Sequence, residues 1–127
     1  MREHEIETIA RDFVFKFNRM CQSERRNFLV KKRNITYETG TQVKTYHVNY
    51  QIRKRRNAWQ VDAVSDGFWI FKKRFPLLRI SQNQGKIRFS GPFTADIGDF
   101  EPKLLKQKLD EYMEICKKQP ADVFAFA

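Results

Sequence analysis

Residues 42–53 read QVKTYHVNYQIR, and this is the clearest strand pattern in the chain. Successive side chains of an extended strand point to opposite faces, so every second residue shares a face. Bulky and polar positions alternate here: Tyr46, Val48, Tyr50 and Ile52 fall on one face, and Thr45, His47, Asn49 and Gln51 on the other. The alternation predicts a strand with one buried and one exposed face.

Further strand patterns lie on both sides of this stretch, each separated by a turn signal. We expect strands at residues 29–39, 68–73, 77–82 and 86–90, and another that begins at Trp59. Gly40, the Asp66-Gly67 pair and Asn83-Gln84-Gly85 mark the turns between them, and Asp-Gly is a strong hairpin signal. Pro76 indicates a bend or an edge position. Residues 28–91 are therefore predicted to form a meander of five or six antiparallel strands.

Amphipathic helices are expected on either side of the meander. In residues 3–21 the apolar positions recur at spacings of three and four: Ile6, Ile9, Ala10, Phe13, Val14, Phe17, Met20 and Cys21. Phe15 falls outside that stripe. Residues 101–118 repeat the pattern, with Asp99 or Glu101 as the expected cap and Pro102 in the first turn. Residues 93–100 are read as a loop.

These elements predict a single α+β domain over residues 1–127. Two amphipathic helices must bury their stripes, and one face of the sheet is the available place. The other face is then open to solvent or to a partner. The apolar tail, residues 119–127, is expected to pack back on the domain or to dock on a second copy in a homodimer.

Positive charge is concentrated on the predicted sheet. Residues 25–91 hold 16 Lys and Arg against only Glu38, Asp62 and Asp66. The segments before and after this stretch are slightly acidic, although the whole chain carries +10. A field of one sign concentrates ligands of the opposite charge, so the partner is expected to be a polyanion.

Hairpin geometry predicts where these cations meet. If the turns centre on Gly40 and on Asp66-Gly67, clusters distant in sequence converge on one rim of the sheet. The expected nucleic-acid-binding residues are Arg25, Arg26, Lys31, Lys32, Arg33, Arg53, Lys54, Arg55, Arg56, Lys72, Lys73 and Arg74. Phosphates would relieve their mutual repulsion and release condensed counterions. A merely solubilising charged surface is the alternative interpretation.

Aromatic residues interleave with the cations in residues 68–75. Trp69 and Phe71 share one strand face, which is either buried or a platform on which bases stack. Stacking favours single-stranded DNA or RNA, because paired bases hide their faces. We expect little base specificity, since no helix is predicted to read a major groove. The alternative is a small adaptor that binds an acidic surface of a partner protein.

Residues suited to catalysis are scarce, so we expect no enzyme, metal site or cofactor. His4 lies near the N-terminus, and His47 lies on the polar face of a strand. Asp62 and Asp66 beside Lys72 are the only candidate metal pair, and the turn already accounts for Asp66. No phosphate-binding glycine loop, nucleophile elbow or zinc-ligand spacing is present.

The two cysteines, Cys21 and Cys116, lie in different predicted helices without metal-like spacing. We expect buried free thiols in a reducing compartment, with a bridge between the helices as the alternative. Residues 1–12 do not resemble a signal peptide, and no apolar run is long enough to span a bilayer. The expectation is therefore a soluble cytoplasmic protein.

Tyr50, Trp59-Gln60-Val61 and Gly67 form a pattern of tyrosine, tryptophan and glycine within the sheet. It resembles the pattern in cone-shaped, ligand-holding domains related to nuclear transport factor 2. The run of several helices that usually precedes that sheet is absent here. The resemblance implies a third possibility, an apolar small-ligand pocket between the sheet and the helices.

Overall fold

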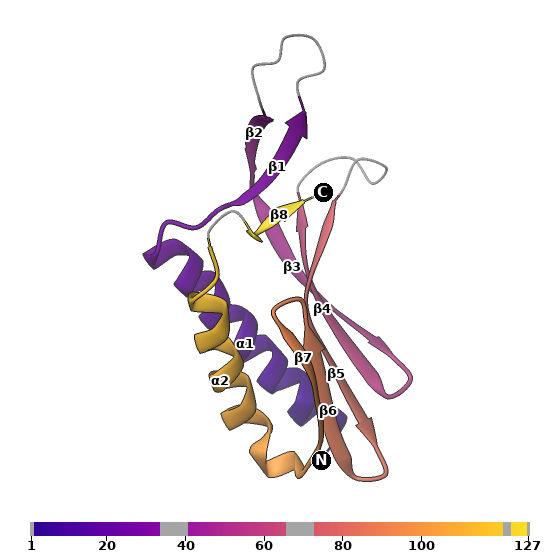
Figure 1. The fold of residues 1–127 in the computed structure, drawn as a ribbon. Coiled ribbons are helices and arrows are strands. Elements are labelled where there is room, and N and C mark those ends of the chain that lie inside the picture. Colours follow the sequence, from indigo (N-terminus) through magenta and orange to yellow (C-terminus); the bar gives the residue numbers. More distant parts are fainter. Residues whose placement is uncertain (1, 34–40, 66–72, 121–122, 127) are drawn as a thin grey trace.

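The computed structural model describes residues 2–33, 41–65, 73–120 and 123–126. Two helices cover one face of a five-stranded antiparallel sheet with strand order β3-β4-β5-β6-β7 (Figure 1). The elements are α1 (Glu3–Ser23), β1 (Phe28–Arg33), β2 (Thr41–Tyr46), β3 (Val48–Arg55), β4 (Ala58–Ser65), β5 (Arg74–Asn83), β6 (Lys86–Gly91), β7 (Thr94–Phe100), η1 (Pro102–Leu104), α2 (Leu105–Lys117) and β8 (Ala125–Phe126). The predicted α+β class, with both helices on one face, is confirmed.

Helix α1 follows the predicted stripe. Its buried residues are Ile6, Ala10, Phe13, Phe17, Met20 and Cys21, whereas Phe15 is exposed. The helix ends with the left-handed Arg25 (φ 55°). The backbone N–H of Arg26 donates to the Cys21 carbonyl, and that of Arg25 to the Gln22 carbonyl. This is a Schellman ending, in which glycine is the usual left-handed residue.

The strand register separates the sheet into two chemically different faces. On the inner face, which the helices cover, Ile52 pairs with Val61, Val61 with Leu78, and Ile80 with Phe89. On the outer face the paired positions are mainly polar: Gln51 with Asp62, Arg53 with Gln60, Gln60 with Arg79, Ser81 with Arg88, and Asn83 with Lys86. The alternation seen in the sequence thus produces one apolar and one charged face.

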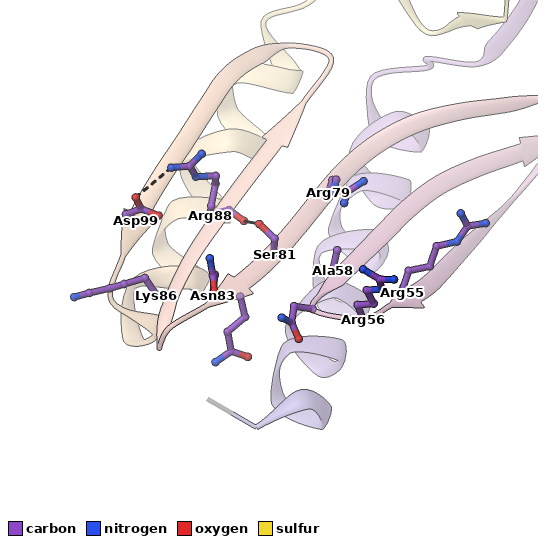
Figure 2. A pocket seen from close by; sticks show the side chains of 11 residues that line it. Arg55, Arg56, Ala58, Arg79, Ser81, Asn83, Lys86, Arg88 and Asp99 are labelled. Carbon is purple, nitrogen blue, oxygen red and sulfur yellow. Dashed lines mark hydrogen bonds and ion pairs between the residues drawn. The ribbon is translucent and has the colours of Figure 1, made fainter.

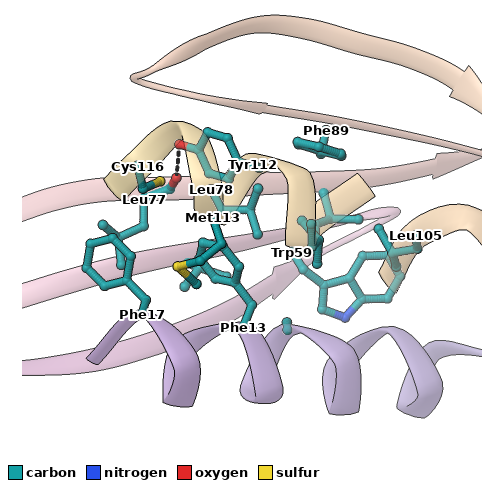
Figure 3. Close-up of a cluster of buried hydrophobic side chains, with 14 of the residues drawn as sticks. Phe13, Phe17, Trp59, Leu77, Leu78, Phe89, Leu105, Tyr112, Met113 and Cys116 are labelled. Carbon is teal, nitrogen blue, oxygen red and sulfur yellow. Dashed lines mark hydrogen bonds between the residues drawn. The ribbon is translucent and has the colours of Figure 1, made fainter. Parts of the chain in front are cut away.

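The core lies between the inner face and the helices (Figure 3). Trp59 and Phe89 from the sheet and Tyr112 from α2 are all at most 1% exposed. The Tyr112 hydroxyl donates a hydrogen bond to the Leu77 carbonyl at 2.8 Å. Its ring packs against the rings of Phe13 and Phe89, both with centroids 5.8 Å away.

The tail residues return to the core. Phe124 is fully buried against Phe17, Phe28 and Phe93, and β8 pairs in parallel with β1. Strands β2, β1 and β8 form a separate three-stranded sheet beside the main one. The expectation that the tail packs back is confirmed. The homodimer through the tail stays a prediction.

Three strand predictions need correction. Residues 93–100 are not a loop, since Thr94–Phe100 forms strand β7. The strand predicted at 42–53 is divided at His47 between the two sheets. The strand predicted at 68–73 is not one of these corrections and stays a prediction, because residues 66–72 lie outside the described residues. Pro76 lies inside β5 rather than before it. Its missing N–H is tolerated because a register shift occurs opposite Asp62, and β6 pairs only with residues 79–83 of β5.

Both cysteines are free and buried, as the first interpretation predicted. Burial raises the pKa of Cys21 to about 11 and that of Cys116 to about 12. Because folding raises the pKa of both thiols, their contribution to stability is fully present below the ordinary thiol pKa of 9.0. That stability is lost as the pH rises through the folded values.

We therefore predict that neither thiol of the native protein reacts with a chromogenic disulfide reagent at pH 8, because the thiolate is the reactive form. Both should react once urea unfolds the chain. The free energy of unfolding should fall between pH 9 and pH 12, and Cys21→Ala with Cys116→Ala should reduce that fall. Rapid reaction in the absence of urea would contradict the buried positions.

Candidate polyanion-binding surface

A shallow hollow of about 710 Å³ lies on the outer face of the sheet (Figure 2). Its lining is almost entirely polar or charged: Arg55, Arg56, Asn57, Ala58, Arg79, Ser81, Gln82, Asn83, Lys86, Arg88 and Asp99. We call these residues the basic hollow. It joins the tip of the β3–β4 hairpin to the tip of the β5–β6 hairpin, so strands distant in sequence contribute to one surface.

Strand geometry explains how the cations reach the same side. Arg79 lies on β5, and Lys86 and Arg88 lie on β6; each shares its face with the polar residues between them. Residues two apart along a strand are about 6.6 Å apart, and neighbouring strands about 4.8 Å. Arg56 occupies the β3–β4 turn with a left-handed φ of 51°. The cations of three strands and one turn therefore lie on the same face of the sheet.

Only some of these charges are neutralised within the protein. Arg88 forms a salt bridge with Asp99 at 3.1 Å, and Lys86 pairs with Glu101. The Lys86 ammonium holds the pKa of the Glu101 carboxyl below its ordinary value. In the described part of the chain, no salt bridge involves Arg55, Arg56 or Arg79. The basic hollow therefore retains excess positive charge that an external anion can neutralise.

The Asp62 carboxylate contacts several side chains on the neighbouring part of the outer face. Its carboxylate is only 4% exposed and accepts hydrogen bonds from Arg53 and Gln60, both at 2.9 Å. Arg74 approaches the same carboxylate at 3.6 Å and donates to Gln51 at 2.9 Å. Asp62 is thus a structural partner of two arginines. Among the described residues no cluster of three or more His, Cys, Asp or Glu could hold a metal ion.

The predicted convergence of three basic clusters is wrong. Arg55 pairs with Ala58 at one end of β4, whereas Arg74 pairs with Val64 at the other end. The error lies in the β4–β5 connection, because this register centres the hairpin near residue 69 rather than on Asp66-Gly67. Arg25 and Arg26 lie close to His47 and Val48, also far from the β3–β4 turn.

Two of the candidate residues have structural roles instead. Lys54 lies on the inner face, where it pairs with Glu3 and lies 5.8 Å from the centre of the Trp59 ring. Arg26 donates hydrogen bonds to the carbonyls of Lys117 and Gln119 at the end of α2. Its side chain is 11% exposed, which leaves little surface for a phosphate.

The structure describes the remaining predicted binding residues to different extents. Lys73 is half-buried, and its backbone N–H donates to the Ser65 hydroxyl. Only the backbone is described at Lys31, Lys32 and Arg33, which lie on β1. Trp69, Phe71 and Lys72 lie outside the described residues, so the predicted stacking platform stays a prediction.

The sequence-based site omitted Arg79, Lys86 and Arg88. The signal for them was present: residues 86–90 read KIRFS, in which Lys86, Arg88 and Ser90 alternate with apolar residues. That alternation places the cations on the face opposite the core. They were missed because they are scattered single charges rather than a run.

No protein-family model matches the chain, and no curated protein or solved structure is significantly similar to it. The described residues form two α-helices, α1 and α2. Neither is long and apolar enough to cross a membrane.

Proposed function

We propose that the protein binds single-stranded nucleic acid through the phosphate groups of its backbone, on the basic hollow of the outer sheet face. One observation carries the proposal: Arg55, Arg56 and Arg79 lie on an open face without salt-bridge partners in the described residues, beside Lys86 and Arg88. Phosphates would replace the missing counter-charges and release condensed cations from the nucleic acid.

Shape favours a single strand over a duplex. A flexible strand can bend so that successive phosphates lie over several cations on one sheet face, whereas duplex phosphates curve away from it. No described residue of the basic hollow is aromatic. Affinity should therefore depend on the phosphates and vary little with base sequence.

The direct test is fluorescence anisotropy with labelled single-stranded oligonucleotides over a salt series. Affinity should fall steeply as salt rises. Replacing Arg56, Arg79 and Arg88 together with Gln should weaken binding about ten- to a hundredfold. The slope of log affinity against log salt should become shallower by about 2, because each phosphate contact contributes about 0.7 for single strands.

A matched control distinguishes the loss of the binding site from the loss of net charge. Lys103 in η1, Lys106 in the first turn of α2 and Lys118 just after α2 are exposed, so changing them to Gln removes three charges elsewhere. This control should retain the original slope. Equal losses in both triple variants would refute a localised site, as would an absence of binding at low salt.

Asp99 should act as an internal competitor of the nucleic acid. Its carboxylate occupies Arg88, so Asp99→Asn should strengthen oligonucleotide binding about two- to fivefold and steepen the salt slope by about 0.7. Asparagine tolerates the left-handed conformation of this position (φ 48°), so the fold should persist. Asp96→Asn, on the same strand, makes the same charge change at a residue without a described salt bridge. An equal gain in both variants would show that only net charge matters.

A further inference from the structure

An exposed aromatic side chain lies on the opposite layer of the molecule. Phe15 of α1 is 59% exposed, and among the side chains that the structure describes Val123 is the only other large hydrophobic one that is exposed. Phe15 borders a groove of about 390 Å³ between α1 and β3, which is lined by Arg11, Val14, Phe15, Asn18, Tyr50 and Ile52. The Tyr50 hydroxyl donates a hydrogen bond to Asn18 within it at 3.3 Å, and the groove shares no lining residue with the basic hollow.

The groove adjoins residues 50–55 of β3, which lie at the edge of the main sheet. Among the described strands, β3 pairs only with β4 and ends the sheet. Such an edge presents backbone N–H and C=O groups to which another extended chain can hydrogen-bond. An added strand would lie about 4.8 Å from β3. Its inward side chains would then meet Ile52 and Phe15, and its outward side chains would lie beside Arg53 and Arg55.

The basic side chains around this edge favour an acidic binding partner. On the outer face this strand carries Arg53, which is paired with Asp62, and Arg55, which has no salt bridge in the described residues and also lines the basic hollow. Lys54 lies on the inner face and pairs with Glu3.

Arg11 beside the groove and Arg19, which lies 5.7 Å from the centre of the Phe15 ring, form no salt bridge in the described residues. A second copy would bring the same basic residues and a further net charge of +10, so like charges oppose self-pairing. Acidic side chains would instead pair across the strands.

We propose that the edge of β3 at residues 50–55 and the Phe15 groove bind an extended acidic segment of a partner protein. The segment would add a strand to the sheet. Apolar residues would alternate with Asp or Glu, with the apolar set on Phe15 and Ile52 and the acidic set beside Arg55. The backbone of β3 supplies affinity, and the two faces supply selectivity.

The probe is a fluorescent eight-residue peptide that alternates Glu or Asp with Val or Phe. It should bind saturably with one peptide per protein. Phe15→Ala should weaken binding on the order of tenfold, because Phe15 supplies most of the exposed apolar contact. This variant should fold normally, since the side chain is already exposed, and circular dichroism checks that. Methylating alternate backbone amides of the peptide, or replacing its acids with Lys, should abolish binding.

The triple variant of Arg56, Arg79 and Arg88 provides the matched control and separates this proposal from the nucleic-acid proposal. It should bind the peptide with unchanged affinity, while Phe15→Ala should leave oligonucleotide binding unchanged. Loss of peptide binding in the triple variant alone would show simple charge attraction to the basic hollow and overturn the proposal. So would insensitivity to amide methylation, or a dimer in light scattering that Phe15→Ala converts to a monomer.

Discussion

Replacing Gly91 with Ala should lower the free energy of unfolding by about 3 kcal/mol. A Cβ atom at this position would lie 2.0 Å from the Tyr112 hydroxyl oxygen and 2.9 Å from the Leu77 carbonyl oxygen. Both distances are shorter than van der Waals contact permits. The tyrosine would have to move, and its buried hydrogen bond to Leu77 would break. Urea unfolding followed by tryptophan fluorescence measures the change.

The other glycines supply graded controls. A Cβ at Gly98 would meet only the side-chain end of Arg88, at 3.1 Å, which is exposed and can move. Gly98→Ala should therefore change stability by less than about 0.5 kcal/mol. Gly85 has open space around it but a φ of 76°, so alanine there should cost about 1 kcal/mol from backbone strain. If all three variants were equally stable, the close contact of Tyr112 with β6 would be wrong.

Replacing Arg26 with Ala should destabilise the protein by about 3 kcal/mol. The guanidinium donates to the carbonyls of Lys117 and Gln119 and lies 5.4 Å from the centre of the Phe124 ring. The last carbonyls of a helix have no partner within it, so Arg26 supplies the donors that end α2. The alanine variant would leave these carbonyls without donors and loosen the packing on Phe124.

Arg26→Lys distinguishes geometry from charge, because lysine keeps the charge but lacks the planar fork of donors. It should recover less than half of the lost stability. Both variants should bind oligonucleotides as the unaltered protein does, provided that measurements are made where the chains remain folded. A loss of oligonucleotide affinity without a loss of stability would restore Arg26 to the binding site.

The helices and the class of fold could be predicted from the sequence because their signals are local. The stripe from Ile6 to Cys21 is a repeat within one element, and it identifies the buried face without knowledge of its partner. Strand β7 escaped prediction because register shifts interrupt its pairing with β6 between Ile87 and Gly91. Its side chains therefore lack a regular alternation that a sequence could reveal.

The site was less predictable because it depends on distances along the chain that no local pattern specifies. The pairing of Val64 with Arg74 requires a longer connection than the Asp-Gly signal indicates, and this alone separates two basic clusters. The role of Arg26 depends on carbonyls more than 90 residues away. Runs of charge in the sequence were also misleading, because neighbours such as Arg53 and Lys54 point to opposite faces.

The position of Phe124 has a consequence during protein synthesis. Its ring contacts Phe17, which the ribosome produces more than one hundred residues earlier. Until Phe124 emerges, the nascent chain cannot complete the packing around Phe17. The Phe17 end of the first helix would remain accessible to chaperones until then, so release from them should follow the emergence of Phe124.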